Sequence, residues 1–89
     1  AYTYAKAGLV AMTCSLAQAM APNIQVNAIA PGAVLPPPGQ GNEYLESLAV
    51  QIPLKRHGTP DDVAEAMLYL LRSDFVSGEL LYVTGGQEL

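Results

Sequence analysis

Tyr2 and Lys6 lie four positions apart near the start of the chain, in a stretch whose composition predicts a helix. Residues at this spacing share one helix face, so the phenol and the ammonium can reach a common ligand. A free tyrosine titrates near ~10, and a neighbouring ammonium lowers that pKa because it favours the phenolate. Such a tyrosine can donate a proton to a carbonyl oxygen. The same spacing also fits an ordinary pair on a solvated helix, and both interpretations stay open here.

Two further segments combine a strand with a glycine turn. Asn27 to Gly32 reads as a short strand that runs into a Pro-Gly break, and residues 82–86 read Tyr-Val-Thr-Gly-Gly. In open α/β sheets, ligands bind beyond the carboxyl ends of strands, and a glycine there lets the backbone approach a flat ligand. Taken singly, each segment is also explained as a strand end and a turn.

The other reactive residue types favour structural roles. His57 is the single histidine and stands before a predicted helix, so we expect a surface or capping role and no metal site. Cys14 is the single cysteine, which excludes an intramolecular disulfide and favours a small buried residue. Three methionines at helical spacing are predicted to fill the core: Met12, Met20 and Met67.

The elements that must position these residues alternate between helices and strands. The sequence predicts helices over residues 1–20, 43–50 and 60–72, strands over 24–29 and 80–83, and an irregular Pro- and Gly-rich loop over 31–41. The helix from Pro60 has the clearest start, because Thr59 is a good N-cap and Asp61 and Asp62 favour the positive end of the helix dipole. A strand, a crossover helix and a second strand predict parallel pairing.

The balance of apolar and charged residues predicts further protein around this chain. Half of the residues (51%) are hydrophobic, only 13% are charged, and the first helix is apolar on nearly all its faces. Two parallel strands are not a stable sheet and need cover on both faces. We therefore expect an α/β fold over residues 1–89, the end of a doubly wound parallel sheet whose beginning is absent.

Charge and length exclude two classes of partner. The net charge is −4 and the four basic residues form no patch in the sequence, which argues against nucleic acid. The apolar run over residues 7–17 is too short to span a bilayer, so we expect no membrane partner and a cytoplasmic protein.

Four segments in register carry a family resemblance that spans essentially the whole chain. They are YTYAKAGL, IQVNAIAPG, PLKRHGTPDDVAEAMLYLL and FVSGELLYVTGGQEL. Together they resemble the C-terminal part of a short-chain dehydrogenase/reductase. This resemblance implies the C-terminal portion of a Rossmann-type doubly wound sheet over residues 1–89, with the N-terminal cofactor-binding half of the domain absent. The stretch from Leu35 to Pro38 is similar to pteridine-reductase-like members, and 3-oxoacyl-(acyl-carrier-protein) reductases are the other subgroup that we consider.

The resemblance implies a role for each matching residue. Tyr2 corresponds to the catalytic acid-base, and Lys6 to the residue that binds the nicotinamide ribose and lowers the tyrosine pKa. Pro31, Gly32 and Val34 match the segment whose backbone contacts the nicotinamide end of the cofactor. The implied cofactor is NADP or NAD, with NADPH preferred, and the implied substrate is a small carbonyl or pterin-like molecule. The family also implies a homo-oligomer, a dimer or a tetramer.

Two departures from the family pattern limit what the chain can do alone. The family usually has a threonine shortly after the Pro-Gly, and Pro36 stands at that place. The family's glycine-rich phosphate loop, its catalytic serine and its supporting asparagine match nothing in these 89 residues. We therefore expect an enzyme whose 89-residue portion is inactive alone. The alternative is a truncated, non-catalytic module for oligomerisation or interaction.

Overall fold

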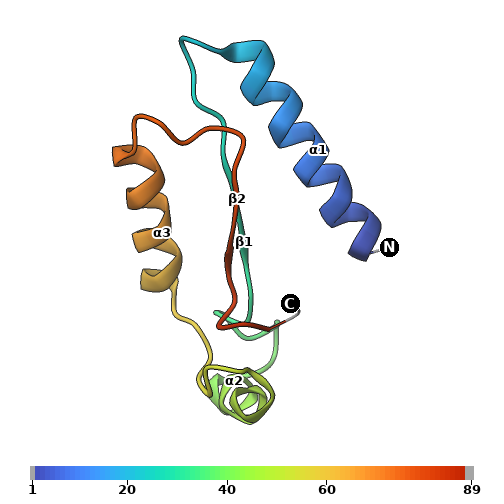
Figure 1. Cartoon of the computed structure of the whole chain (residues 1–89). Helices are drawn as coiled ribbons and strands as arrows, with labels where there is room; N and C mark the ends of the chain where they lie inside the picture. The colour runs from blue at the N-terminus through green and yellow to red at the C-terminus, as the bar shows by residue number, and fades with distance from the viewer. Residues whose placement is uncertain (1, 88–89) are drawn as a thin grey trace.

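The order of elements is the predicted one. The structure, a computed structural model, describes residues 2–87, and their side chains from Tyr4 onward. Its elements are α1 (Tyr2–Met20), β1 (Ala28–Pro31), α2 (Asn42–Leu48), the 3-10 helix η1 (Ala49–Gln51), α3 (Pro60–Arg72) and β2 (Leu80–Val83) (Figure 1).

The two strands pair in parallel, as predicted. Ala28 lies opposite Leu80 and Pro31 opposite Val83. The Gly32 amide extends the pairing past the end of β1, because it donates to the Val83 carbonyl over 2.9 Å. The carboxyl ends of both strands therefore meet at one edge of the sheet, which is the edge where ligands of parallel sheets bind.

The prediction of the first strand was wrong in its limits. The sequence placed it at residues 24–29, whereas β1 covers Ala28–Pro31. The preceding residues bond instead to the loop between α3 and β2: Gln25 Nε2 donates to the carbonyls of Ser73 and Val76 over 2.6 and 2.9 Å. Pro31 was expected to break the strand but forms its last residue, where no further ladder bond is needed from its nitrogen.

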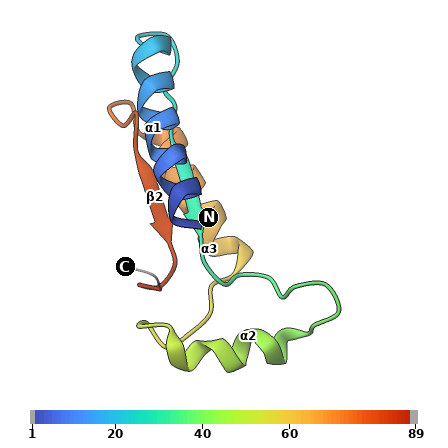
Figure 2. The ribbon, with the colours of Figure 1, turned by 90° about the vertical axis from the view of Figure 1, so that its right-hand side faces the viewer.

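The sheet lies between two helices. α3 packs against both strands, and α1 runs along the opposite face (Figures 1 and 2). One close approach of α1 lies at the bend before β2, where a Cβ on Gly78 would stand 3.5 Å from the Cβ of Ala17. Cys14 Sγ also lies 3.6 Å from the Gly78 carbonyl oxygen. Small residues on both sides therefore let this end of α1 reach the sheet.

The start of α3 forms as its sequence predicts. Thr59 accepts a hydrogen bond from the Asp62 amide, and the Asp62 carboxylate accepts one from the Thr59 amide over 2.8 Å. These reciprocal bonds form a capping box, which satisfies amides that a helix start otherwise leaves unpaired. The box fixes where the loop after η1 turns into α3.

The predicted core is only partly present among the described side chains. Ala17, Leu45 and Ile52 are buried, together with Thr13, whose hydroxyl donates to the Leu9 carbonyl. The expectation that the cysteine and methionines are buried was wrong for this chain. All four are exposed, because α1 and α3 each meet the sheet on one side only: Cys14, Met12, Met20 and Met67.

Candidate functional site

Three chain segments meet at the carboxyl edge of the sheet. They are the exit from β1 (residues 32–34), the turn after β2 (residues 84–87) and the loop between η1 and α3 (residues 52–59). The Gly58 amide donates to the Ala33 carbonyl over 2.8 Å, and the Leu54 amide donates to the Gly85 carbonyl over 3.0 Å. Backbone bonds thus join both strand exits to the third segment, so the edge has a defined shape.

Gly32 is required by the packing of the two strand exits. A Cβ at this position would lie 3.0 Å from the Thr84 Cα and 3.1 Å from Gln87 Oε1. Real Cβ atoms avoid contact this close with backbone, so only glycine fits without a shift. The sequence predicts that this glycine faces a ligand, but it does not reveal how closely Thr84 packs against it. Its predicted contact with a nicotinamide stays a prediction.

The neighbouring predicted residues lie at the same edge. Pro31 ends β1, and Val34 follows two residues after Gly32, with a Cγ1 that a Cβ on Gly58 would approach to 2.8 Å. Val34 therefore packs beside the loop that leads into α3. The structure brings Pro31, Gly32 and Val34 together as one strand exit.

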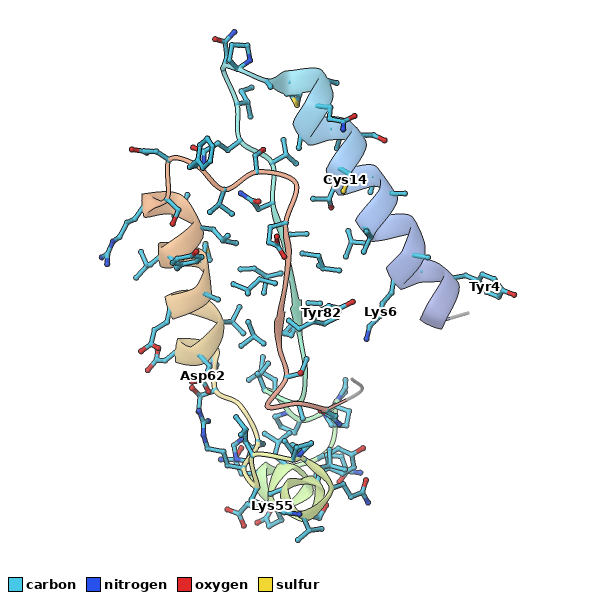
Figure 3. The ribbon with its side chains drawn as sticks, viewed as in Figure 1. Tyr4, Lys6, Cys14, Lys55, Asp62 and Tyr82 are labelled. Atoms are coloured by element: carbon cyan, nitrogen blue, oxygen red, sulfur yellow. The ribbon has the colours of Figure 1, made fainter. Side chains whose placement is uncertain are left out.

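Lys6 reaches toward this edge from α1. Its Nζ lies 5.1 Å from the ring centroid of Tyr82 on β2, and Figure 3 shows the two side chains directed toward one another. This separation lies within the range of a cation–π interaction. Tyr2 begins α1, one turn before Lys6, but its side chain lies outside the part that the structure describes. The shared helix face of the two residues is therefore set by the backbone alone.

A pocket of about 270 Å³ adjoins the edge and is lined by Ala33, Leu54, Arg56, Gly58 and Thr84, among others. At its rim the Arg56 guanidinium forms two hydrogen bonds with the Asp62 carboxylate, over 3.0 and 3.2 Å. These bonds and the Thr59 amide lower the pKa of Asp62 to about 2. A carboxylate held ionised in this way is a poor acid at neutral pH, so the pair serves to tie the loop to α3.

The remaining candidates have structural contacts. His57, for which a surface or capping role was expected, is half-buried, and its Nδ1 lies 2.7 Å from the Gly58 carbonyl oxygen in the loop before α3. Among the residues that the structure describes, no three His, Cys, Asp or Glu side chains gather as a metal site would require. Within the same residues, no helix is long and apolar enough to cross a membrane.

The residues present fit one end of a nicotinamide nucleotide. A bound nicotinamide ribose would meet the Lys6 ammonium as a hydrogen-bond donor, and the exits of β1 and β2 would provide backbone at the edge of the sheet. The hydrogen bond from the Gly32 amide to the Val83 carbonyl joins these two exits, and the missing Cβ at Gly32 leaves room for Thr84. The phosphates of such a nucleotide need a different element, a glycine-rich turn at the start of a helix.

The chain is similar to known proteins over almost all of its length. The family described as Enoyl-(Acyl carrier protein) reductase matches residues 1–88. Carbonyl reductase family member 4 of Danio rerio is 46% identical over 90 residues, which cover 99% of this chain and 37% of the relative. The 3-oxoacyl-(acyl-carrier-protein) reductase FabG of Aquifex aeolicus is 40% identical over 95 residues, covering 96% of this chain and 36% of that protein.

A solved structure shares the fold. FolM alternative dihydrofolate reductase 1 from Brucella canis, complexed with NADP, has a TM-score of 0.82 and 37% identity; the match covers 97% of this chain and 34% of that one. The chain belongs to the short-chain dehydrogenase/reductase family, and its fold is part of the family's Rossmann-type sheet. It spans little more than a third of the length of the relatives that it matches.

Proposed function

We propose that this chain is the catalytic-tyrosine portion of a reductase that transfers a hydride from NADPH or NADH to a carbonyl. The observation that carries the proposal is the position of Lys6, one helical turn after Tyr2 and over the carboxyl half of the sheet. Family membership supports the assignment of the two residues. The phosphate-binding glycines belong to a portion of the protein outside these 89 residues.

Each residue of the site has a distinct task in this reaction. Tyr2 donates its phenolic proton to the substrate oxygen while the C=O bond becomes a C–OH bond. Lys6 hydrogen-bonds the ribose hydroxyls and lowers the pKa of Tyr2, because its positive charge stabilises the phenolate. The strand exits around Pro31, Gly32 and Val34 hold the flat end of the cofactor, which supplies the hydride when bound.

A 3-oxoacyl thioester is the substrate that we favour, and a pterin is the second candidate. The names of the relatives support both, since one is a 3-oxoacyl-(acyl-carrier-protein) reductase and one solved structure is an alternative dihydrofolate reductase. The loop that would meet the substrate contains Leu35, which is largely exposed, and three consecutive prolines. Prolines restrict this loop because each has a fixed φ angle.

The exposed apolar surface supports the proposal that more protein covers this chain. Val10, Met12, Leu16 and Met20 are all at least 40% exposed along α1. Exposed apolar area of this kind marks a contact surface. We propose that the rest of the domain and a second copy of the protein cover it. A purely non-catalytic interaction module would use the same surface, so the enzymatic test must decide between them.

The test uses the full-length protein that carries this chain. Binding of NADPH and NADH is measured by the change in their fluorescence, and turnover is then measured with acetoacetyl-CoA and with a dihydropterin. We expect NADPH binding and reduction of the thioester. Reduction of the pterin alone would change the substrate assignment, and absence of any nicotinamide binding would overturn the reductase proposal in favour of the interaction module.

A further inference from the structure

Tyr82 has a contact that the proposed reaction does not yet use. It lies on β2, and its side chain points toward α1 although 42% of its surface is exposed (Figure 3). The Lys6 ammonium lies 5.1 Å from its ring centroid. A cation over a ring face within about 6 Å is attracted by the negative face of the aromatic quadrupole. Tyr82 therefore acts on the side chain to which we assign ribose binding.

The path of α1 along the sheet explains why Lys6 lies beside Tyr82. The helix also meets the sheet at the bend before β2, where Ala17 approaches Gly78. From Ala17 back to Lys6 the helix advances about 16 Å, and from Gly78 forward to Tyr82 an extended chain advances about 13 Å. Because α1 runs antiparallel to β2 and these two lengths are similar, Lys6 and Tyr82 lie at about the same distance along the sheet from the approach of Ala17 to Gly78. One contact anchors the far end of the helix, and the other lies near the carboxyl edge.

We propose that Tyr82 is a positioning residue for Lys6. Its ring keeps the ammonium on the sheet side of α1, at the height of the strand exits, before cofactor binds. The bound cofactor then meets a lysine that has already lost part of its conformational freedom, which reduces the entropy cost of binding. This inference rests on the proposed function, because it needs Lys6 to contact the nicotinamide ribose.

A purely structural role for Tyr82 predicts different results for substitutions. If the ring only fills space between α1 and the sheet, Tyr82→Leu keeps much of that apolar contact, and its effect does not depend on Lys6. If the ring holds the ammonium, Tyr82→Phe retains the interaction and Tyr82→Leu removes it. Tyr4→Leu is the matched control. Tyr4 lies on α1, the helix that carries Lys6, but its side chain is 83% exposed and points away from the sheet (Figure 3).

The first measurement needs no cofactor. In the full-length protein with labelled lysine, the ring current of Tyr82 should shift the NMR signals of the Lys6 ε-methylene protons upfield. We expect that shift to remain in Tyr82→Phe and Tyr4→Leu and to disappear in Tyr82→Leu. An unshifted Lys6 signal in the unsubstituted protein would overturn the positioning role.

The second measurement is a double-mutant cycle on the dissociation constant of NADPH. We expect Tyr82→Leu to weaken binding about two- to fivefold, the size that a cation–π contact at an exposed site supports. The same substitution in a Lys6→Met protein should have no further effect, and Tyr82→Phe should bind as the unsubstituted protein does. An equal loss with and without Lys6 would overturn the positioning role. If Lys6→Met itself leaves NADPH binding unchanged, the assignment of Lys6 in the proposed function fails instead.

Discussion

The turn after β2 offers a direct test of how the carboxyl edge is built. Gly85 has a φ of +66°, and a Cβ there would lie 2.8 Å from Cγ2 of Ile52, which is only 1% exposed. Gly39 has a similar φ of +83°, but nothing lies within 4 Å of the position of its Cβ. Gly85→Ala therefore meets both an unfavourable backbone conformation and a collision, whereas Gly39→Ala meets the first alone.

The pair of substitutions separates the two costs. We expect Gly39→Ala to lower the free energy of unfolding by about 1–2 kcal/mol, because the left-handed conformation disfavours a Cβ. Gly85→Ala should cost about 1–3 kcal/mol more, which is the usual penalty for overpacking a filled site. Urea unfolding of the full-length protein measures both values, provided that the slope against denaturant is unchanged.

A third variant identifies the colliding group. In an Ile52→Ala protein the Cγ2 atom is gone, so the extra cost of Gly85→Ala should disappear and only the backbone cost should remain. Equal costs for Gly39→Ala and Gly85→Ala, or an extra cost that persists without the Ile52 side chain, would refute the packing that we describe for this turn.

Two predictions concern the start of α3. Thr59→Ala should lower the free energy of unfolding by about 1 kcal/mol because the cap is lost, and Thr59→Ser should recover most of it in the same urea experiment. The Asp62 carboxyl, with a pKa lowered from 3.8 to about 2 by Arg56 and the Thr59 amide, stabilises the folded state above its unfolded pKa, and that contribution is lost as the pH falls toward 2. The stability difference between the natural protein and Asp62→Asn should thus be constant from pH 7 to pH 5 and shrink below about 4; a difference that is the same at pH 3 and at pH 7 would contradict it.

Local sequence signals predicted most of the elements. The cap at Thr59 and the repeat of apolar residues after it identify α3, because a helix start depends on side chains that are close in sequence. The limits of β1 could not be found in this way. Asn27 and the residues before it have a strand-like composition, but their side chains bond to a loop about fifty positions away. A strand-like pattern of residues does not reveal that their side chains will hydrogen-bond to backbone groups far away in the sequence.

For the candidate site, the sequence supports a hypothesis about the chemistry but does not predict the contacts between its side chains. The spacing of Tyr2 and Lys6 and the Pro31-Gly32 break indicated which residue types could act. The contact of Lys6 with Tyr82 depends on how α1 lies across β2, and the need for glycine at position 32 depends on the backbone of the Thr84 turn. Both features depend on the tertiary structure, so the local sequence does not predict them. Alternation along β2 was the one available signal, since it puts Tyr82 on the face opposite that of its neighbours in sequence.

The proposed role of Tyr2 as the proton donor of a nicotinamide-dependent reductase is tested by substituting phenylalanine for this tyrosine. The full-length Tyr2→Phe protein keeps the ring and loses only the hydroxyl. We expect it to bind NADPH with unchanged affinity, and we expect its rate of carbonyl reduction in a single turnover to fall by a factor of about 10²–10⁴, the usual contribution of a positioned acid. If the substituted protein binds NADPH and reduces the carbonyl as fast as the unsubstituted protein, Tyr2 is not the proton donor.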